Sequence, residues 1–113
     1  MTITENKFGR VTVVSLEGTL FGEPDATVLR ATINRLKERD EKHVVLDLGG
    51  LKAINSTGLG VLVTALTSLR KRSGDMLLAR LSEKVYALMM ITHLVRVFKI
   101  YDTVERAVES FGT

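Results

Sequence analysis

The chain has 113 residues, of which 45% are hydrophobic and 26% charged, proportions typical of one ordinary globular domain. It contains no cysteine, which excludes disulfide bonds and thiolate metal sites. The first ten residues are polar and no apolar run approaches the roughly 18 residues of a membrane span, so we expect a soluble, cytoplasmic protein with a single domain over residues 1–113.

The net charge of +3 raises the question of nucleic-acid binding, which the distribution of charge disfavours. Basic residues are spread along the chain, and their one cluster, at residues 70–72, lies where a helix is expected to end. Cations at that position complement the helix dipole. Aromatic residues make up only 5% and tryptophan is absent, so little is available for stacking on single strands.

The first part of the chain predicts two strands and a helix. Residues 10–18 (RVTVVSLEG) are β-branched and alternate in polarity, as strands do, and residues 2–8 are a candidate partner strand. Pro24 suits the first turn of a helix. Apolar residues then recur at helical spacing on one face, at Leu29, Ile33 and Leu36.

The middle of the chain predicts a strand, a helix and another strand. Residues 44–48 (VVLDL) form a short, continuous apolar run, typical of a strand covered on both faces. A second helix follows and ends near Gly74. Its expected inner face consists of Leu59, Leu62, Leu66 and Leu69. Residues 76–81 (MLLARL) predict a further buried strand.

The last part predicts a helix, a short strand and a final helix. Ser82 can cap the third helix, whose apolar face consists of Val85, Leu88 and Met89. Residues 97–101 (VFKIY) predict the strand. Asp102 and Glu105 have the spacing of a capping box, so the final helix should open there. The residues expected to pack from it are Val104, Ala107, Val108 and Phe111.

The element order β-β-α-β-α-β-α-β-α predicts an α/β fold. Alternating strands and helices call for a mixed, mostly parallel sheet with right-handed crossovers. We expect four or five strands packed with about four helices.

Candidate catalytic and metal-ligating residues are few. His43 and His93 lie 50 residues apart with no ligand motif nearby, which disfavours a metal site. Ser56 lacks the G-x-S-x-G context of a nucleophile elbow. Asp47 is either a perturbed base or, as we favour, an acid near the strand end that bonds loop amides. Residues 49–60 are glycine-rich but lack the P-loop and dinucleotide spacings. We therefore expect no enzyme, no metal and no cofactor.

A polar segment, Asn55-Ser56-Thr57-Gly58, separates two apolar runs at a strand-to-helix junction. Asn55 or Ser56 makes a good N-cap, and Gly58 permits close backbone approach. A phosphate on a hydroxyl there would meet unpaired N–H groups and the positive end of the helix dipole, a gain of roughly 0.3–1 kcal/mol. It would also add about −1.5 to −2 charges to the surface, enough to switch a partner while the domain stays folded.

The segment VVLDLGGLKAINSTGLGVLV, at residues 44–63, resembles the signature of anti-sigma factor antagonists, the single-domain members of the STAS family. In that pattern a strand containing an Asp leads to Asp-Ser-Ser/Thr-Gly-Leu-Gly, which opens a helix. The resemblance extends over the whole chain. LEGTL at residues 16–20 is similar to the family's Gly-x-Leu turn, and VFKIYDTVERAV at residues 97–108 is similar to its ending.

This resemblance implies a partner switch. In such proteins the unphosphorylated form binds an anti-sigma factor, itself a serine kinase of the histidine-kinase-like ATPase class, and frees the sigma factor for transcription. Phosphorylation breaks the complex, and a metal-dependent serine phosphatase resets it. The modified hydroxyl matches Ser56, with Thr57 as its unmodified neighbour. The residues implied to bind the partner are Thr19, Leu20, Phe21, Asn55, Ser56, Thr57, Gly58 and Leu59.

Two residues depart from the family pattern. Asn55 stands where the motif has an acidic residue, and Phe21 stands where the family often has Asp. Phe21 is either an exposed anchor for a partner or tucked under its loop. The departures favour a second hypothesis, a non-switching STAS scaffold subunit of a stress-signalling or membrane-transporter assembly. A third hypothesis, an enzymatic or nucleotide-binding site with Asp47 and Ser56, has no support in the sequence.

Overall fold

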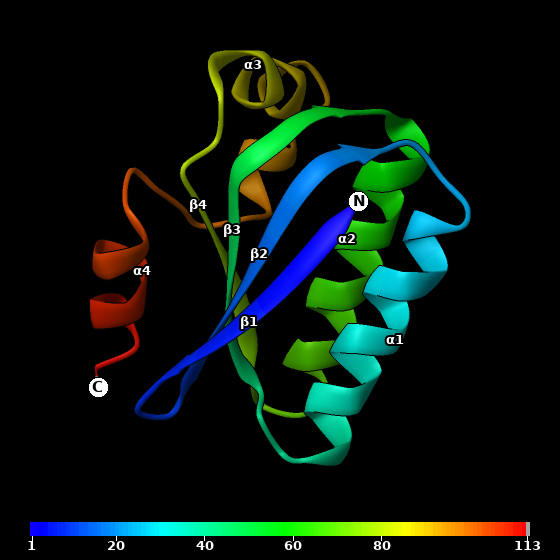
Figure 1. Cartoon of the computed structure of the whole chain (residues 1–113). Coiled ribbons are helices and arrows are strands. Elements are labelled where there is room, and N and C mark those ends of the chain that lie inside the picture. Colours follow the sequence, from blue (N-terminus) through cyan, green and yellow to red (C-terminus); the bar gives the residue numbers. More distant parts are fainter. Residues whose placement is uncertain (113) are drawn as a thin grey trace.

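A computed structural model describes residues 1–112. Within them the chain forms five strands and four α-helices in the predicted order, with one short 3-10 helix added (Figure 1). The strands are β1 Thr2–Phe8, β2 Val11–Leu20, β3 His43–Ile54, β4 Asp75–Ala79 and β5 Ile100–Tyr101. The helices are α1 Asp25–Glu38, α2 Ser56–Arg70, α3 Glu83–Ile91, η1 Leu94–Arg96 and α4 Val104–Ser110. The predicted α/β fold with a mixed, mostly parallel sheet is confirmed.

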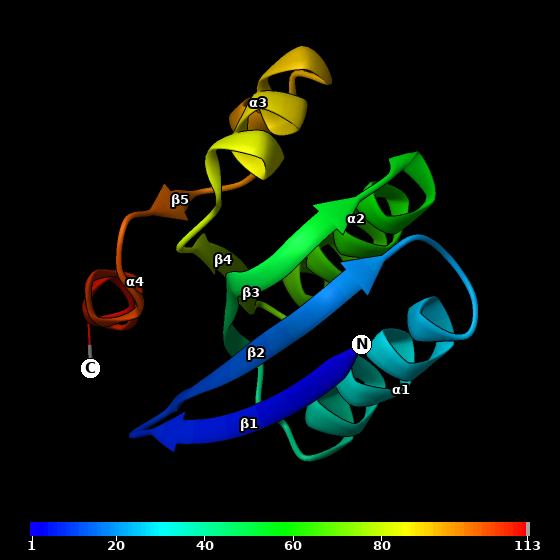
Figure 2. The ribbon, with the colours of Figure 1, turned by 45° about the horizontal axis from the view of Figure 1, so that its top comes forward.

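The five strands form one sheet in the order β1-β2-β3-β4-β5. The β1–β2 hairpin is antiparallel and every other pair is parallel (Figure 2). Parallel neighbours require crossover connections, which α1, α2 and α3 provide. Pairing of β2 with β3 extends from Val11 opposite His43 to Leu20 opposite Ile54. The carboxyl ends of these two long strands therefore lie side by side at one edge of the sheet.

One face of the sheet is covered by α1 and α2, which run next to each other (Figure 1). The inner faces predicted from helical spacing are correct, since every predicted residue is buried: Leu29, Ile33, Leu36, Leu59, Leu62, Leu66 and Leu69. Each such side chain stabilises the fold by about 1.5–3 kcal/mol through removal of apolar surface from water. This layer holds the larger part of the core.

The opposite face is covered in part by α4, whose Ala107 packs with Val13, Val45 and Leu77 of the sheet. Helix α3 lies on neither face. It sits beyond the carboxyl end of β3 (Figures 1 and 2), and its Val85 and Met89 close that end of the main core.

Strand β3 is longer than predicted, because residues 49–54 continue the strand instead of forming a loop. They remain paired with the second half of β2, where Gly50 lies opposite Glu17 and Ile54 opposite Leu20. The register of the pair shifts between Ser15 and Glu17 and again between Gly18 and Thr19, and at each shift β3 contains one residue more than β2. The two consecutive glycines resemble a turn in sequence, but strand pairing overrides that local tendency.

Three other predicted boundaries are wrong. Strand β4 ends at Ala79 rather than at residue 81, because Arg80 adopts a left-handed conformation with φ 61°. The strand predicted over residues 97–101 is only Ile100–Tyr101, since Val97 and Phe98 form a turn that follows the 3-10 helix, both donating to the Leu94 carbonyl. Helix α4 is capped by Thr103, whose hydroxyl accepts from the Arg106 N–H at 3.1 Å, and not by Asp102.

Candidate functional site

The two segments predicted to form the site meet at the carboxyl edge of the sheet. Thr19 lies opposite Ala53 in the ladder, and the Asn55 N–H donates to the Leu20 carbonyl at 3.4 Å. Each segment follows directly from one of two neighbouring parallel strands. The sheet therefore fixes their separation, and the loop after β2 lies beside the first turn of α2.

Asn55 joins these two segments through its side chain. Its backbone is extended (φ −114°, ψ −175°), and its Oδ1 accepts from the Gly58 N–H at 3.0 Å, which makes it the N-cap of α2. Its Nδ2 donates to the Phe21 carbonyl at 2.8 Å. One amide group therefore caps the helix and fixes the neighbouring loop.

Ser56 and Thr57 are the first two residues of α2, and both are exposed. The first N–H groups of a helix have no partner within it, and here only that of Gly58 is capped by Asn55. Within residues 1–112 no hydrogen bond engages the Ser56 hydroxyl. This free hydroxyl thus lies at the positive end of a 15-residue helix.

Gly58 allows the start of α2 to approach the end of β2. A Cβ atom at this position would lie 2.4 Å from the Leu20 carbonyl oxygen and 2.7 Å from Cγ1 of Ile54. Contacts that short do not occur between real atoms, so a larger residue would displace the helix. Glycine here sets the position of the Ser56 turn against the sheet.

Three of the eight predicted partner-binding residues are core residues, namely Leu20, Gly58 and Leu59. Leu20 has no exposed surface and Leu59 retains 4%. In the free domain these three residues therefore lie beneath the surface of the site and support it from below, and their predicted contact with a partner stays a prediction. The other five are exposed or half-buried: Thr19, Phe21, Asn55, Ser56 and Thr57.

Phe21 extends from the loop after β2 with 53% of its surface exposed. Of the two alternatives for this residue, the tucked conformation is thus wrong. The loop is tied to its surroundings on both sides, because Asn55 holds the Phe21 carbonyl and the Ala26 N–H donates to the Gly22 carbonyl at 2.8 Å. An exposed aromatic ring is in this way presented from a fixed backbone beside Ser56.

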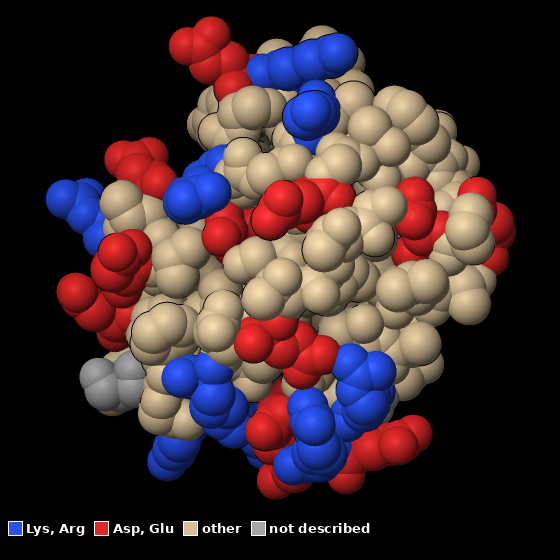
Figure 3. Space-filling view, in the orientation of Figure 1, with Lys and Arg blue, Asp and Glu red and all other residues tan. Residues whose placement is uncertain are grey.

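Charged side chains are sparse around the first turn of α2. This turn contains no acidic residue. In Figure 3 the surface over the start of α2 is uncharged, although basic side chains lie over the neighbouring part of β3, and basic and acidic side chains crowd the opposite end. Among those at the crowded end, Lys7 and Arg39 both pair with Glu41.

Asp47 lies in the middle of β3 and not near its end. Its Oδ1 accepts from the Gly49 N–H at 3.0 Å and pairs with Nε of Arg80 at 2.9 Å, while its Oδ2 accepts from the Ser15 hydroxyl at 3.1 Å. The favoured amide-bonding role is thus correct, with a strand amide in place of a loop amide. At roughly 3.3 Å per residue of strand, Asp47 is about 20 Å from the Ser56 turn, so the structure does not bring the two together.

Arg80 is the partner of Asp47 that the sequence did not indicate. Its left-handed backbone turns the chain from β4 toward α3, and its guanidinium lies so close to Gly49 that a Cβ atom there would fall 1.8 Å from Nη2. No sequence motif predicts a left-handed turn at a residue other than glycine.

Metal-ligating side chains do not gather anywhere in residues 1–112, where no three His, Asp or Glu residues are close enough to share an ion. His43 instead stacks against Phe111, with 5.0 Å between ring centroids.

None of the helices in this part of the chain is long and apolar enough to cross a membrane.

Comparison with known protein families matches residues 3–107 to the STAS domain. The chain belongs to the STAS family. A Bordetella bronchiseptica protein whose name marks it as a candidate anti-sigma factor antagonist, BtrV, is 29% identical over the whole of this chain and 97% of its own length. These findings confirm the resemblance recognised in the sequence.

Two solved structures show the same fold. The crystal structure of a candidate anti-sigma factor antagonist from Thermotoga maritima has a TM-score of 0.88 at 26% identity, covering 96% of this chain and 92% of that one. The phosphorylated form of the Bacillus cell fate determinant SpoIIAA has a TM-score of 0.76 at 18% identity, covering 97% and 99%. The names of these relatives describe regulators and no reaction, in agreement with the prediction that this STAS domain is not an enzyme.

Proposed function

We propose that this STAS domain is an anti-sigma factor antagonist in a phosphorylation-controlled partner switch, with Ser56 as the modified residue. The observation that carries the proposal is the free, exposed Ser56 hydroxyl at the N-terminus of α2, next to the loop whose Phe21 side chain is also exposed. The partner is an anti-sigma factor serine kinase, a serine phosphatase resets the switch, and the cycle takes place in the cytoplasm. The names of the relatives support this assignment.

In the unphosphorylated state the exposed residues of the two segments form the docking surface. Phe21 supplies the aromatic anchor, a residue type that dominates binding energy when it enters a partner's pocket. Small polar groups on the same two segments add to this surface, from Thr19, Asn55, Ser56 and Thr57. Because the kinase must reach the hydroxyl that it modifies, docking and modification use the same surface.

Phosphorylation of Ser56 breaks the complex by charge and leaves the domain folded. A dianionic group within a docked interface meets desolvation and like-charge repulsion, which cost several kcal/mol. About 2.7 kcal/mol already lowers the affinity a hundredfold. The same group is tolerated by the isolated domain, because it meets the free N–H groups of α2 and no carboxylate from that turn. A phosphorylated form of a protein with this fold supports the mechanism.

The first experiment uses wild type, Ser56→Ala and Ser56→Asp as parallel baits in native lysate, with captured proteins identified by mass spectrometry. We expect a histidine-kinase-like ATPase on wild type and Ser56→Ala, and its loss with Ser56→Asp. The purified ATPase with ATP should then phosphorylate wild type and Thr57→Ala but not Ser56→Ala. Leu59→Ala, which truncates a buried side chain at a cost of about 2–5 kcal/mol, controls for general loss of stability.

Capture of the same partners by all Ser56 variants, with no phosphate on the wild type, would contradict the switch. That outcome would favour the non-switching scaffold subunit, in which the polar segment is only the cap of α2.

A further inference from the structure

Helix α3 is apolar on both sides. It buries Val85 and Met89 in the core, yet its outer surface exposes Tyr86 to 42%, Met90 to 54% and Ile91 to 75%. A surface helix with a single buried face normally carries polar residues on the other side. Clustered exposed apolar side chains on a folded domain mark a surface that binds something.

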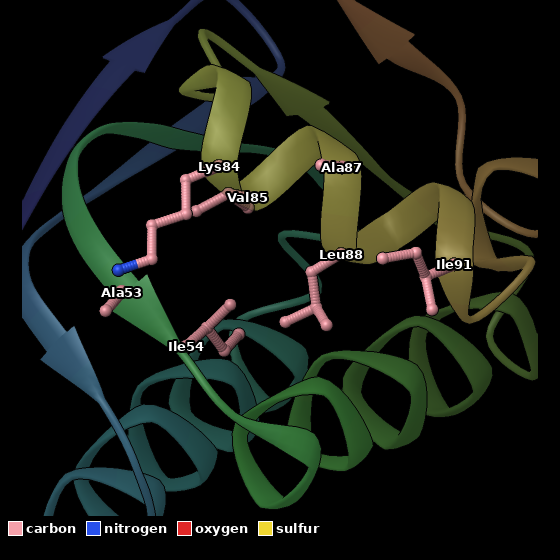
Figure 4. A pocket seen from close by; sticks show the side chains of 7 residues that line it. All are labelled: Ala53, Ile54, Lys84, Val85, Ala87, Leu88 and Ile91. Carbon is pink, nitrogen blue, oxygen red and sulfur yellow. The ribbon is translucent and has the colours of Figure 1, made fainter.

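A groove of about 310 Å³ lies between α3 and the end of β3 (Figure 4). Its apolar walls are Ala53 and Ile54 from β3, and Val85, Ala87, Leu88 and Ile91 from α3. In Figure 4 the side chains of Leu88 and Ile91 point from α3 toward α2. The lining is therefore almost wholly hydrocarbon.

The groove has one charged lining residue, Lys84. Its side chain extends from the first turn of α3 toward Ala53 (Figure 4), and neither a hydrogen bond nor an ion pair holds its ammonium group among residues 1–112. A lysine in this position covers the groove with its methylene groups and presents a cation at its edge. The chemistry that fits is an apolar segment with one acidic side chain.

The groove adjoins the candidate phosphorylation site along the chain. Ile54 is both a wall of the groove and the last residue of β3, Asn55 is the next residue, and Ser56 opens α2. A partner that covers Ser56 and Phe21 therefore needs to extend across this junction to reach the accessible groove residues Leu88 and Ile91.

The structure holds α3 in place before any partner arrives. Ser82 caps the helix by accepting from the Val85 N–H at 3.2 Å. The chain leading into it turns at Arg80, which the Asp47 carboxylate fixes at 2.9 Å. A groove already formed in the free protein requires no ordering on binding.

We propose that this groove is the second half of the docking surface, and that it takes an apolar segment of the anti-sigma factor kinase whose acidic side chain pairs with Lys84. The inference rests on the proposed function and adds α3 to the switch. Because the acidic group of the partner would lie close to the Ser56 turn, a phosphate there repels the same segment that the groove holds.

The test measures the affinity of the purified ATPase captured by the wild type for three variants. Ile91→Glu places a charge on the most exposed wall residue and should weaken binding at least about tenfold. Lys84→Glu should weaken binding and reduce its dependence on salt. Val28→Glu, the same kind of change at an exposed valine of α1, should bind like wild type.

Each outcome decides between the two proposals. If Ser56→Asp loses the ATPase while Ile91→Glu and Lys84→Glu bind like wild type, the groove inference is wrong and the proposed function stands. If wild type captures no such ATPase, both fail. Thermal unfolding of each variant checks its fold, and Ala87→Glu, at another exposed residue that lines the groove, replaces Ile91→Glu should the latter not fold.

Discussion

Asn55 holds the backbone carbonyl of Phe21 with its side-chain amide, at an Nδ2–O distance of 2.8 Å. The same side chain accepts the Gly58 N–H and caps α2. A carboxylate, the group found here in the family motif, could accept from Gly58 but has no proton to donate to Phe21. Asn55 thus makes a hydrogen bond that the acidic residue of the motif cannot make. This bond fixes the loop that contains Phe21, the second residue that differs from the family pattern.

Asn55→Asp should keep the helix cap and lose the tether. Aspartate and asparagine are about equal as N-caps, so we expect little loss of stability but greater backbone motion at residues 21–23. Order parameters from ¹⁵N relaxation should fall from about 0.85 toward 0.6 at these residues. Asn55→Ala is the control, since it loses cap and tether together and should cost about 0.5–2 kcal/mol. Unchanged loop order in both variants would show that the tether does not hold the loop.

A negative charge at Ser56 should stabilise the isolated domain. We expect Ser56→Asp to raise the free energy of unfolding by about 0.3–1 kcal/mol relative to Ser56→Asn, because the two differ in charge at a helix N-terminus. Urea denaturation at low and high salt measures the difference, which salt should diminish. A less stable Ser56→Asp would mean that the site does not accept an anion, and that loss of partner binding by this variant reflects damage to the fold.

Two glycines of α2 should respond in opposite ways to alanine. At Gly58 the new Cβ would lie 2.4 Å from the Leu20 carbonyl oxygen, so Gly58→Ala should destabilise the domain by about 1–3 kcal/mol. At Gly60 nothing lies within 4 Å, so Gly60→Ala should stabilise the helix by about 0.5–1 kcal/mol. Denaturant midpoints measure both. Equal effects of the two substitutions would contradict the close approach of α2 to β2.

Acid should remove a contact between the β1–β2 hairpin and the start of β3. The hydrogen bond from Lys7, 2.8 Å from Glu41, lowers the pKa of the Glu41 carboxyl below its usual value of 4.5, with further help from Arg39. The folded pKa is thus below the unfolded one. The resulting stability is present above the unfolded value and lost as the pH falls through the folded value.

The measurement for this contact compares wild type with Glu41→Gln. Their difference in unfolding free energy should stay below about 1 kcal/mol near neutral pH, as is usual for exposed ion pairs, and should shrink in acid below the usual glutamate pKa of 4.5. A difference that does not change with pH would contradict the assigned pairing.

The elements that sequence spacing predicted well are those whose faces are set by burial. The leucines of α2 recur at helical spacing because one side of the helix faces the sheet, and the structure buries all four. A cap at Asn55 or Ser56 was equally visible, because few residue types satisfy the first N–H groups of a helix, and the structure shows that Asn55 is the cap.

The features that the sequence concealed depend on contacts between distant segments. Gly49 and Gly50 resemble a turn, and only pairing with β2 keeps them in a strand. Leu20 and Leu59 follow the family motif, yet whether they face a partner or the core depends on how α2 meets the sheet. The groove beneath Ile91 could not be predicted, because its walls lie far apart along the chain.

The close contact of Gly58 with Leu20 shows that the residues that position the site are different from the residues that a partner would contact. Recognition is carried by short exposed segments, whereas the position of those segments is set by buried neighbours that no partner touches. An exposed residue such as Phe21 can therefore be exchanged without disturbing the scaffold. Duplicated copies of a domain built this way can acquire different partners by a few surface changes, and parallel signalling pathways in one cell can remain insulated from each other.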